Sequence, residues 1–262
     1  QAIAGRDYAD RLNQVLVNLK GNISEDDHKL LQTPKGKKEL MLVISTDKGL
    51  CGGLNTNLLK KVRVEMVEGS DVVTVGRKLR QSLAKTGSKI VSDWEVGDPT
   101  PFSEAKSIGA YLTERFLSGQ YSAVKVAFTN FETTLTQTPW VSQLLPVEAS
   151  TLAEKRAYEG IGKDGEVAET AKDESMLRDY IFEPSPDGVL DALLPLYLNY
   201  QVYQMLLEAR ASEHSARMVA MKSATDNAEN MIKDLTLEYN KVRQAAITSE
   251  LLEITTAMKA ME

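Results

Sequence analysis

Apolar residues in the middle of the chain occur in short runs that alternate with stretches of helical spacing. Five runs are expected to form strands, at residues 40–44, 71–76, 89–91, 123–128 and 140–146. Helical spacing is found between them, at residues 55–67, 79–85 and 102–118. The first run is apolar throughout, which is typical of a strand buried on both faces. The alternation predicts βαβ units, and therefore an α/β globular domain with a largely parallel sheet over residues 38–150.

The end of the chain, residues 186–262, carries one helical pattern of unusual length. Neither proline nor glycine occurs after Pro195, an interval of 67 residues. Such an interval extends over about 100 Å as an α-helix. Its apolar stripe is rich in alanine, methionine, serine and threonine, rather than the isoleucine and leucine of a tight zipper. A domain of this size cannot bury so long a helix, so we expect it to project and to pack along something else.

Two further segments complete the predicted organisation. Residues 1–20 place apolar side chains at helical spacing and are expected to form a helix fragment. Because no N-cap residue precedes them, this helix is expected to begin upstream of residue 1. Residues 151–185 are dominated by glutamate, lysine, aspartate and glycine, which indicates a surface linker.

Composition narrows the classes of function. The formal net charge of −6 argues against nucleic acid as a partner, because phosphate binding needs clustered lysine and arginine. Cys51 is the single cysteine, and the two histidines, His28 and His214, are expected to be solvated and too few for a histidine-rich metal site. No run of 18 apolar residues occurs, so a role at a membrane would require another subunit to hold the chain there.

The Gly-Leu-Cys-Gly-Gly stretch at residues 49–53 follows a predicted strand and precedes a helix, where nucleotide-binding loops lie. Its spacing matches neither a dinucleotide fingerprint nor a P-loop, so we expect a tight turn in which glycines let the helix approach the strand. Asp47 and Lys48 are expected to be a turn aspartate and a surface lysine, and Cys51 a structural thiol. The Glu-His pair at 213–214 lacks the second histidine of a zinc motif. No catalytic, metal or cofactor site, and no cofactor, is predicted.

Two stretches of the chain carry long and specific motifs. Residues 45–57 read STDKGLCGGLNTN. Residues 211–228 read ASEHSARMVAMKSATDNA, and the second motif continues through 239–248. Both resemble the γ subunit of F-type ATP synthases, the central rotor shaft, and shorter similarities at 5–9 and 180–184 extend the resemblance over most of the chain. The resemblance implies a Rossmann-like, five-stranded, mostly parallel α/β domain and a mechanical subunit without a catalytic site. It also implies long antiparallel coiled-coil helices, of which residues 1–20 would be an N-terminal remnant.

The resemblance places the far end of the long helix within a ring of alternating α and β subunits. Arg243, Gln244 and Thr248 lie on the stretch that is similar to the family's contact with the catch loop of a β subunit. The chemistry would then belong to the β subunits. Rotation of this chain would couple proton translocation through the c-ring to ATP synthesis or hydrolysis.

The resemblance also assigns residues nearer the base. Glu213 and Arg217 lie where family members couple shaft and foot, and Tyr180 and Glu183 correspond to the foot that meets the polar loops of the c-ring. The α/β domain would lie beside the ε subunit and the c-ring. The chain would be a peripheral membrane protein on the cytoplasmic face of the bacterial inner membrane, or of an equivalent organelle membrane.

Some alternatives stay open. Residues 254–262 are similar to the family's N-terminal helix rather than to its usual ending, which natural divergence, permutation or the joining of separated segments would each explain. The cysteine pair of the chloroplast-type regulatory insertion is absent, so thiol switching is not expected. The rival functions are a small α/β nucleotide-binding enzyme with a helical extension, and a coiled-coil scaffold unrelated to rotation.

Overall fold

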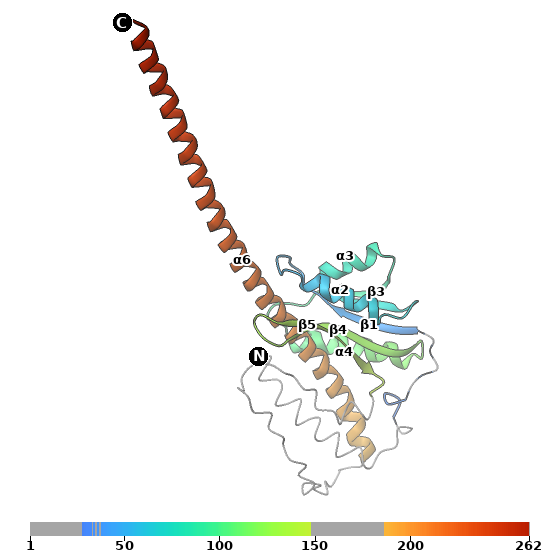
Figure 1. The fold of residues 1–262 in the computed structure, drawn as a ribbon. Helices are drawn as coiled ribbons and strands as arrows, with labels where there is room; N and C mark the ends of the chain where they lie inside the picture. The colour runs from blue at the N-terminus through green and yellow to red at the C-terminus, as the bar shows by residue number, and fades with distance from the viewer. Residues whose placement is uncertain (1–27, 33, 35, 37, 148–185, 262) are drawn as a thin grey trace, which may run out of the picture. The chain divides into compact units, whose positions relative to one another are not determined.

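The computed structural model describes residues 28–32, 34, 36, 38–147 and 186–261. The elements, drawn in Figure 1, are β1 (Lys38–Ile44), α2 (Leu54–Glu65), β2 (Asp71–Val75), α3 (Arg77–Lys85), β3 (Lys89–Trp94), α4 (Phe102–Leu117), β4 (Tyr121–Phe131), β5 (Gln137–Leu145) and α6 (Pro186–Met261). Each predicted strand and helix from residue 38 onward is present, with ends displaced by a few residues. The expected helix at residues 1–20 lies outside the described residues.

The five strands form one mixed, mostly parallel sheet in the order β3-β2-β1-β4-β5. The pairs β1–β2, β2–β3 and β1–β4 are parallel, and β5 pairs antiparallel to β4 at the edge. The chain between β4 and β5 is short, whereas a parallel crossover needs a dozen or more residues, so β5 can only return alongside β4. The predicted α/β fold is confirmed.

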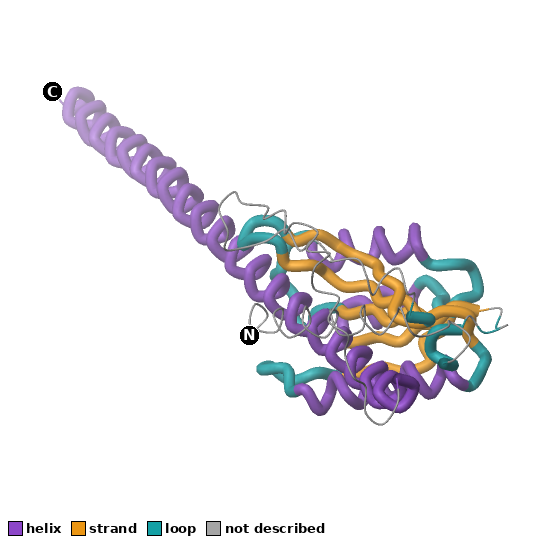
Figure 2. The backbone as a smooth tube through the Cα atoms, turned by 90° about the horizontal axis from the view of Figure 1, so that it is seen from below, coloured by secondary structure: helices purple, strands orange, loops and turns teal. Residues whose placement is uncertain are grey.

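Helices cover both faces of the sheet, as Figure 2 shows. Side chains alternate along each strand, so neighbouring residues face opposite layers. Met41 and Val43 pack in the core that α2 and α3 close. Leu40 and Leu42 pack in the larger core that α4 and the first part of α6 close. This double burial explains the apolar run without interruption that the sequence shows for β1.

The predicted long helix is present as α6, which is 76 residues long. The chain divides into two compact units, one ending at Arg217 and the other running from Met218 to Glu262. In the first unit, Leu194, Leu198 and Leu206 are buried at helical spacing in the larger core. Gly109 of α4 permits a close approach, since a Cβ there would meet the Asn199 side chain at 2.3 Å.

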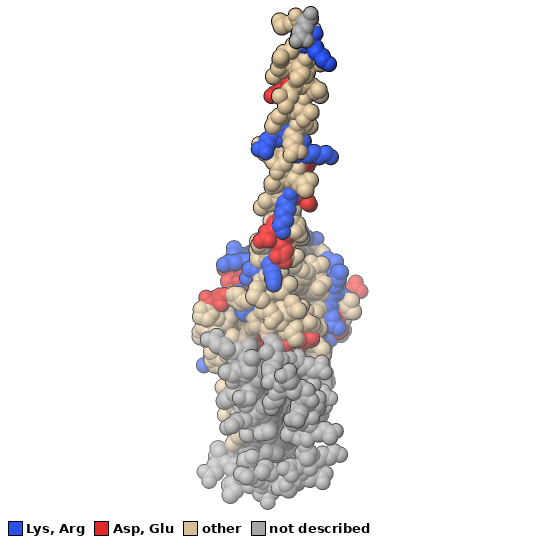
Figure 3. Space-filling model, turned by 60° about the vertical axis from the view of Figure 1, so that its left-hand side comes forward, with Lys and Arg blue, Asp and Glu red and all other residues tan. Residues whose placement is uncertain are grey.

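In the second unit the described side chains are almost all exposed, including many large apolar ones. Leu237 is 72% exposed and Met258 is 65% exposed, for example. Charged side chains of both signs are scattered along this stretch, with uncharged surface between them (Figure 3). An apolar stripe of this kind is typical of a helix that is covered in an assembly.

A buried polar cluster lies at the edge where the parallel strands begin. Asp71 starts β2 and is 4% exposed. Its carboxylate accepts a hydrogen bond of 2.9 Å from the Tyr121 hydroxyl and lies 3.4 Å from the Lys89 ammonium and 3.9 Å from that of Lys38. Parallel register brings these four strand starts together. Burial, and then the hydrogen bond to Asp71, raise the pKa of Tyr121 to about 12.

This raised pKa predicts a loss of stability in alkali. Below about pH 10, the ordinary tyrosine pKa, the phenol is neutral in both the folded and unfolded chains. Between about pH 10 and pH 12 the unfolded chain releases the proton first, so up to about 2–3 kcal/mol of folding free energy is lost. Urea unfolding at successive pH values should show this loss in the wild type and not in Tyr121→Phe. Parallel pH profiles for the two proteins would contradict the expectation.

Candidate functional site

The loop after β1, residues 45–53, forms a tight turn held by side-chain hydrogen bonds, and we term it the first loop. Leu50 and Gly52 adopt positive φ angles of 64° and 57°. The Asn55 amide donates to the Thr46 hydroxyl at 2.7 Å and to the Cys51 sulfur at 3.3 Å. Cys51 is 4% exposed, as expected for a structural thiol. The loop has the predicted turn, and its only thiol is enclosed within it.

The close approach of backbone segments occurs at a different glycine from those expected. A Cβ on Gly52 would meet nothing within 4 Å, and one on Gly53 would contact only Asn57 of its own helix. By contrast, a Cβ on Gly76, between β2 and α3, would lie 2.3 Å from the Ser45 carbonyl oxygen. Gly52 and Gly53 therefore serve the turn. The close approach of α3 to β1 depends instead on Gly76.

α6 passes over the carboxyl ends of the parallel strands, the position where open α/β sheets commonly bind ligands. Only a small cavity of about 10 Å³, room for about one water molecule, lies between Ile44 and Val75 at the strand ends and Arg210 and Glu213 on α6. Near it, the Ser212 hydroxyl donates to a carbonyl of β4 at 3.1 Å. The helix therefore occupies the crevice in which a nucleotide would have to bind.

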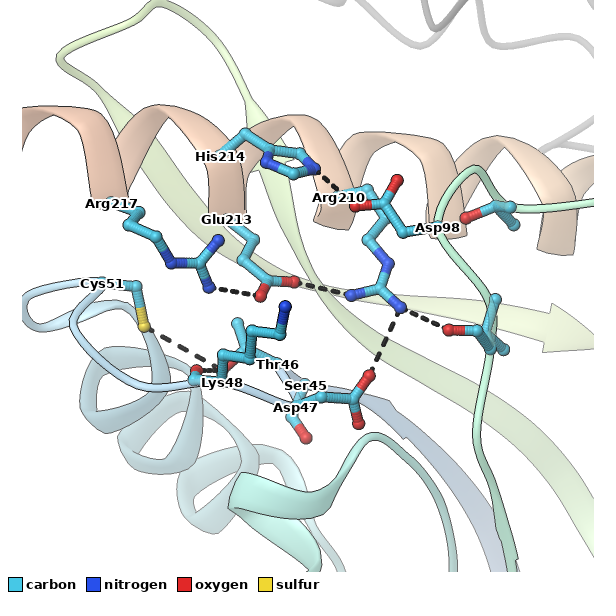
Figure 4. Close-up of polar contacts among 12 residues, drawn as sticks. Ser45, Thr46, Asp47, Lys48, Cys51, Asp98, Arg210, Glu213, His214 and Arg217 are labelled. Carbon is cyan, nitrogen blue, oxygen red and sulfur yellow. Dashed lines mark hydrogen bonds and ion pairs between the residues drawn. The ribbon is translucent and has the colours of Figure 1, made fainter.

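Four charged side chains of alternating sign connect α6 to the first loop, and we term them the charge chain (Figure 4). Asp47 in the loop lies 3.3 Å from the Arg210 guanidinium. Arg210 lies 2.9 Å from one oxygen of Glu213, and Arg217 lies 2.5 Å from its other oxygen. Arg217 also donates to the carbonyl oxygen of Gly49 at 3.4 Å. The two sequence stretches that carry the family resemblance therefore meet in space.

Because the charge chain is largely buried, each of its charges needs a partner of opposite sign. The Glu213 side chain is 5% exposed, and those of Arg210 and Asp47 are 18% and 20% exposed. A carboxylate so removed from water must be compensated by opposite charge and by hydrogen bonds. Glu213 has one guanidinium on each oxygen, and the alternation of signs leaves the four groups neutral together. Neutrality and full pairing let this polar chain lie beside the apolar core.

Both histidines have a ring nitrogen within hydrogen-bonding distance of an aspartate carboxylate. His214 lies 3.1 Å from Asp98, and its side chain is 57% exposed. His28 lies 3.0 Å from Asp191 of α6, and its side chain is only 16% exposed. Its other ring nitrogen accepts a hydrogen bond from the backbone of Leu30. His214 is solvated as expected, whereas His28 is not, because its partner Asp191 is distant in sequence and only the fold brings the two together.

The structure brings together some of the residues predicted to be functional. Glu213 and Arg217 are paired within the charge chain. Asp47 does more than shape a turn, since it accepts from the backbone of Arg77 at 3.2 Å as well as pairing with Arg210. Arg210 was missed by sequence reasoning, although Arg210, Glu213 and Arg217 stand at helix positions i, i+3 and i+7. This spacing puts alternating charges on one helix face, and it could have identified Arg210 as part of the site.

The other predicted contact residues fall elsewhere. Arg243, Gln244 and Thr248 lie in the second unit and are exposed, and the Thr248 hydroxyl donates to the carbonyl of Gln244 at 2.8 Å. Tyr180 and Glu183 lie outside the described residues.

Within the described residues, no group of three or more histidine, cysteine, aspartate or glutamate side chains could hold a metal ion. No described helix combines the length and the apolar character that crossing a membrane requires.

Comparison with known proteins gives one consistent family. A family model described as ATP synthase matches residues 1–261. The ATP synthase gamma chain of Akkermansia muciniphila is 45% identical over 262 residues, which cover 100% of this chain and 87% of that protein. The ATP synthase gamma chain of Opitutus terrae is 41% identical over 259 residues, which cover 99% of this chain and 86% of that protein.

Solved structures also have a similar fold. One of them is a chain of the Tetrahymena thermophila mitochondrial ATP synthase, from a structure of its central stalk and c-ring. The TM-score is 0.56 at 20% sequence identity, and the match covers 86% of this chain and 97% of that chain. At this identity the likeness bears on the fold alone.

Proposed function

Because this chain belongs to the family of ATP synthase gamma chains, we propose that it turns within a ring of catalytic subunits and couples proton flow to ATP synthesis and hydrolysis. It is the gamma subunit of the central stalk, a non-catalytic part of an ATP synthase complex that contains F1 and a c-ring. It is associated with the membrane through that complex. The observation that carries this proposal is the match to gamma chains over the whole of this chain, together with the length of α6 and the exposure of its second part.

Individual partner subunits can be proposed for each part of the chain. We propose that the second unit contacts the α and β subunits, because its apolar side chains are exposed along the helix. The sheet domain, the predicted base over residues 38–150, would contact the ε subunit and the c-ring. The predicted linker and foot at 151–185 lie outside the described residues, and the predicted helical part at 186–262 corresponds to α6. The complex would lie on the cytoplasmic face of the bacterial inner membrane, or of an equivalent organelle membrane.

Roles for individual residues can be proposed on the same basis. Arg243, Gln244 and Thr248 would contact the catch loop of a β subunit, and their exposure on α6 leaves them available for this contact. Glu213 and Arg217 would couple shaft and foot, and their pairing beside the first loop supports a coupling role at this level of the helix.

Tyr180 and Glu183 are proposed as the foot that meets the c-ring, a role that rests on the resemblance alone.

Rotation of an asymmetric helix can drive chemistry without a catalytic group in this chain. At each angle the helix presents a different face to each β subunit. A face that contacts the open and closed states of β unequally shifts the equilibrium between them. The coupling is reciprocal, so that ATP hydrolysis drives rotation in reverse. Catalysis therefore stays in the β subunits, and this chain determines which of them is favoured.

The rival function as a nucleotide-binding enzyme has little support in the geometry. Its binding loop would be the turn after β1, which lacks the spacing of phosphate-binding loops. α6 also occupies the crevice at the carboxyl ends of the strands. The charge chain lines this crevice with side chains that pair with one another. These observations favour a mechanical subunit over an enzyme.

The proposal is tested by assembling this chain with the other subunits of the complex in membrane vesicles. The chain should purify with an α/β hexamer, and the vesicles should pump protons when ATP is added. The double variant Arg243→Ala with Gln244→Ala should assemble, yet lower the protons pumped per ATP about fivefold, because a contact with β is lost.

A matched control for this test is Lys233→Ala with Thr236→Ala, which removes polar side chains that are also exposed on α6 but lie outside the assigned contact. The control should pump normally. Failure of the wild-type chain to join the hexamer would refute the function, and unchanged pumping in the double variant would refute the assigned contact.

A further inference from the structure

We propose that Arg210 is a positioning residue for energy coupling, because it holds the Glu213–Arg217 pair against the first loop and thereby makes the sheet domain turn with α6. This inference rests on the proposed function. It adds a residue that the resemblance does not assign, and it identifies where torque passes between the helix and the sheet.

The Arg210 guanidinium joins three separate parts of the first unit (Figure 4). One terminal nitrogen contacts the carboxylate of Asp47, at 3.3 Å, and donates to the carbonyl oxygen of Val96 at 2.5 Å. The other terminal nitrogen donates to Glu213 at 2.9 Å. Asp47 follows β1, and Val96 follows β3. The planar fork of arginine can serve three acceptors at fixed angles, which the single ammonium of lysine cannot do in the same way.

Arg210 acts through Glu213. Its hydrogen bond occupies one carboxylate oxygen of Glu213, while Arg217 occupies the other. Arg217 in turn donates to the carbonyl oxygen of Gly49 in the first loop. Loss of Arg210 would leave Glu213 held from one side only, and Arg217 would lose its fixed partner. The contact between α6 and the first loop would then be less well oriented.

The hydrogen bonds of the charge chain depend strongly on their angles, and this property suits them to transmit torque. Apolar packing, such as that of Leu206 in the core, is non-directional and opposes rotation of a helix about its own axis only through shape. Hydrogen bonds weaken steeply when their angles change, so charged pairs at the helix surface resist such rotation. The charge chain also lies at the end of the first unit, which stops at Arg217.

The test compares variants in the assembled enzyme, in membrane vesicles, by the ratio of protons pumped to ATP hydrolysed. Arg210→Ala should keep ATP hydrolysis and lower this ratio about fivefold. Arg210→Lys, which keeps the charge without the fork, should lower it to a smaller extent. The control is Arg80→Ala, which breaks a more exposed pair with Asp93 on the sheet domain and should leave the ratio unchanged.

The outcomes separate the inference from the proposed function. A purely structural Arg210 would lower hydrolysis and pumping together, and the unchanged ratio would overturn the inference while wild-type pumping leaves the function standing. Where Arg210→Ala fails to assemble, Arg210→Lys decides: a lowered ratio supports the inference and a normal ratio overturns it. Vesicles with the wild-type chain that do not pump at all would instead refute the proposed function.

Discussion

Replacement of Gly76 by alanine is expected to lower the free energy of unfolding by about 4 kcal/mol, the sum of backbone strain and steric overlap. Gly76 has φ 87° and ψ 153°, a conformation that is essentially restricted to glycine. A Cβ there would also lie 2.3 Å from the Ser45 carbonyl oxygen and 2.9 Å from its carbonyl carbon. Since both atoms are backbone, relief requires β1 and α3 to move apart.

Urea unfolding followed by tryptophan fluorescence measures this loss, because both tryptophans, Trp94 and Trp140, lie in strands of the sheet. The matched control is Gly69→Ala, at a φ of 83° with nothing within 4 Å of the added carbon. It should cost only about 1 kcal/mol, the strain of a positive φ. Equal losses for the two variants would show that the approach of Gly76 to Ser45 is unimportant.

Replacement of Glu213 by alanine is expected to destabilise the sheet domain by about 3 kcal/mol, the usual cost of removing one partner from a buried ion pair. Two guanidinium groups, those of Arg210 and Arg217, share this carboxylate. Its removal leaves two partly buried positive charges close together without the group that separates them. The same fluorescence measurement reports the loss, because the charge chain borders the sheet.

The control for this prediction is Glu65→Ala. Glu65 also pairs with a cation on its own helix, at 2.9 Å from Lys61, but both side chains are 41% exposed. An exposed i,i+4 pair contributes little, so this variant should unfold almost as the wild type does. A Glu213→Ala protein that matched Glu65→Ala in stability would show that the charge chain does not hold α6 to the sheet.

The limits of sequence reasoning are clear at particular residues. The strand at 140–146 was recognised from its apolar pattern, but its antiparallel direction depends on the short connection and on the free edge of β4. Asp71, Lys89 and Tyr121 lie far apart in sequence, and parallel register alone makes them one cluster. The contacts of Arg210 with Asp47 and Val96 were unpredictable, because these partners lie more than a hundred residues earlier in the chain.

The sequence by itself determined the order of strands and helices, the long uninterrupted helix and the family, because periodicity and local motifs are properties of neighbouring residues. Tertiary structure alone decided that the stretches at 45–57 and 211–228 touch, that Glu213 is shared by two arginines, and that α6 fills the crevice at the strand ends. Contacts of this kind depend on how elements pack in space. The spacing of apolar residues shows which face of a helix or strand can pack. It does not show which other element that face will contact.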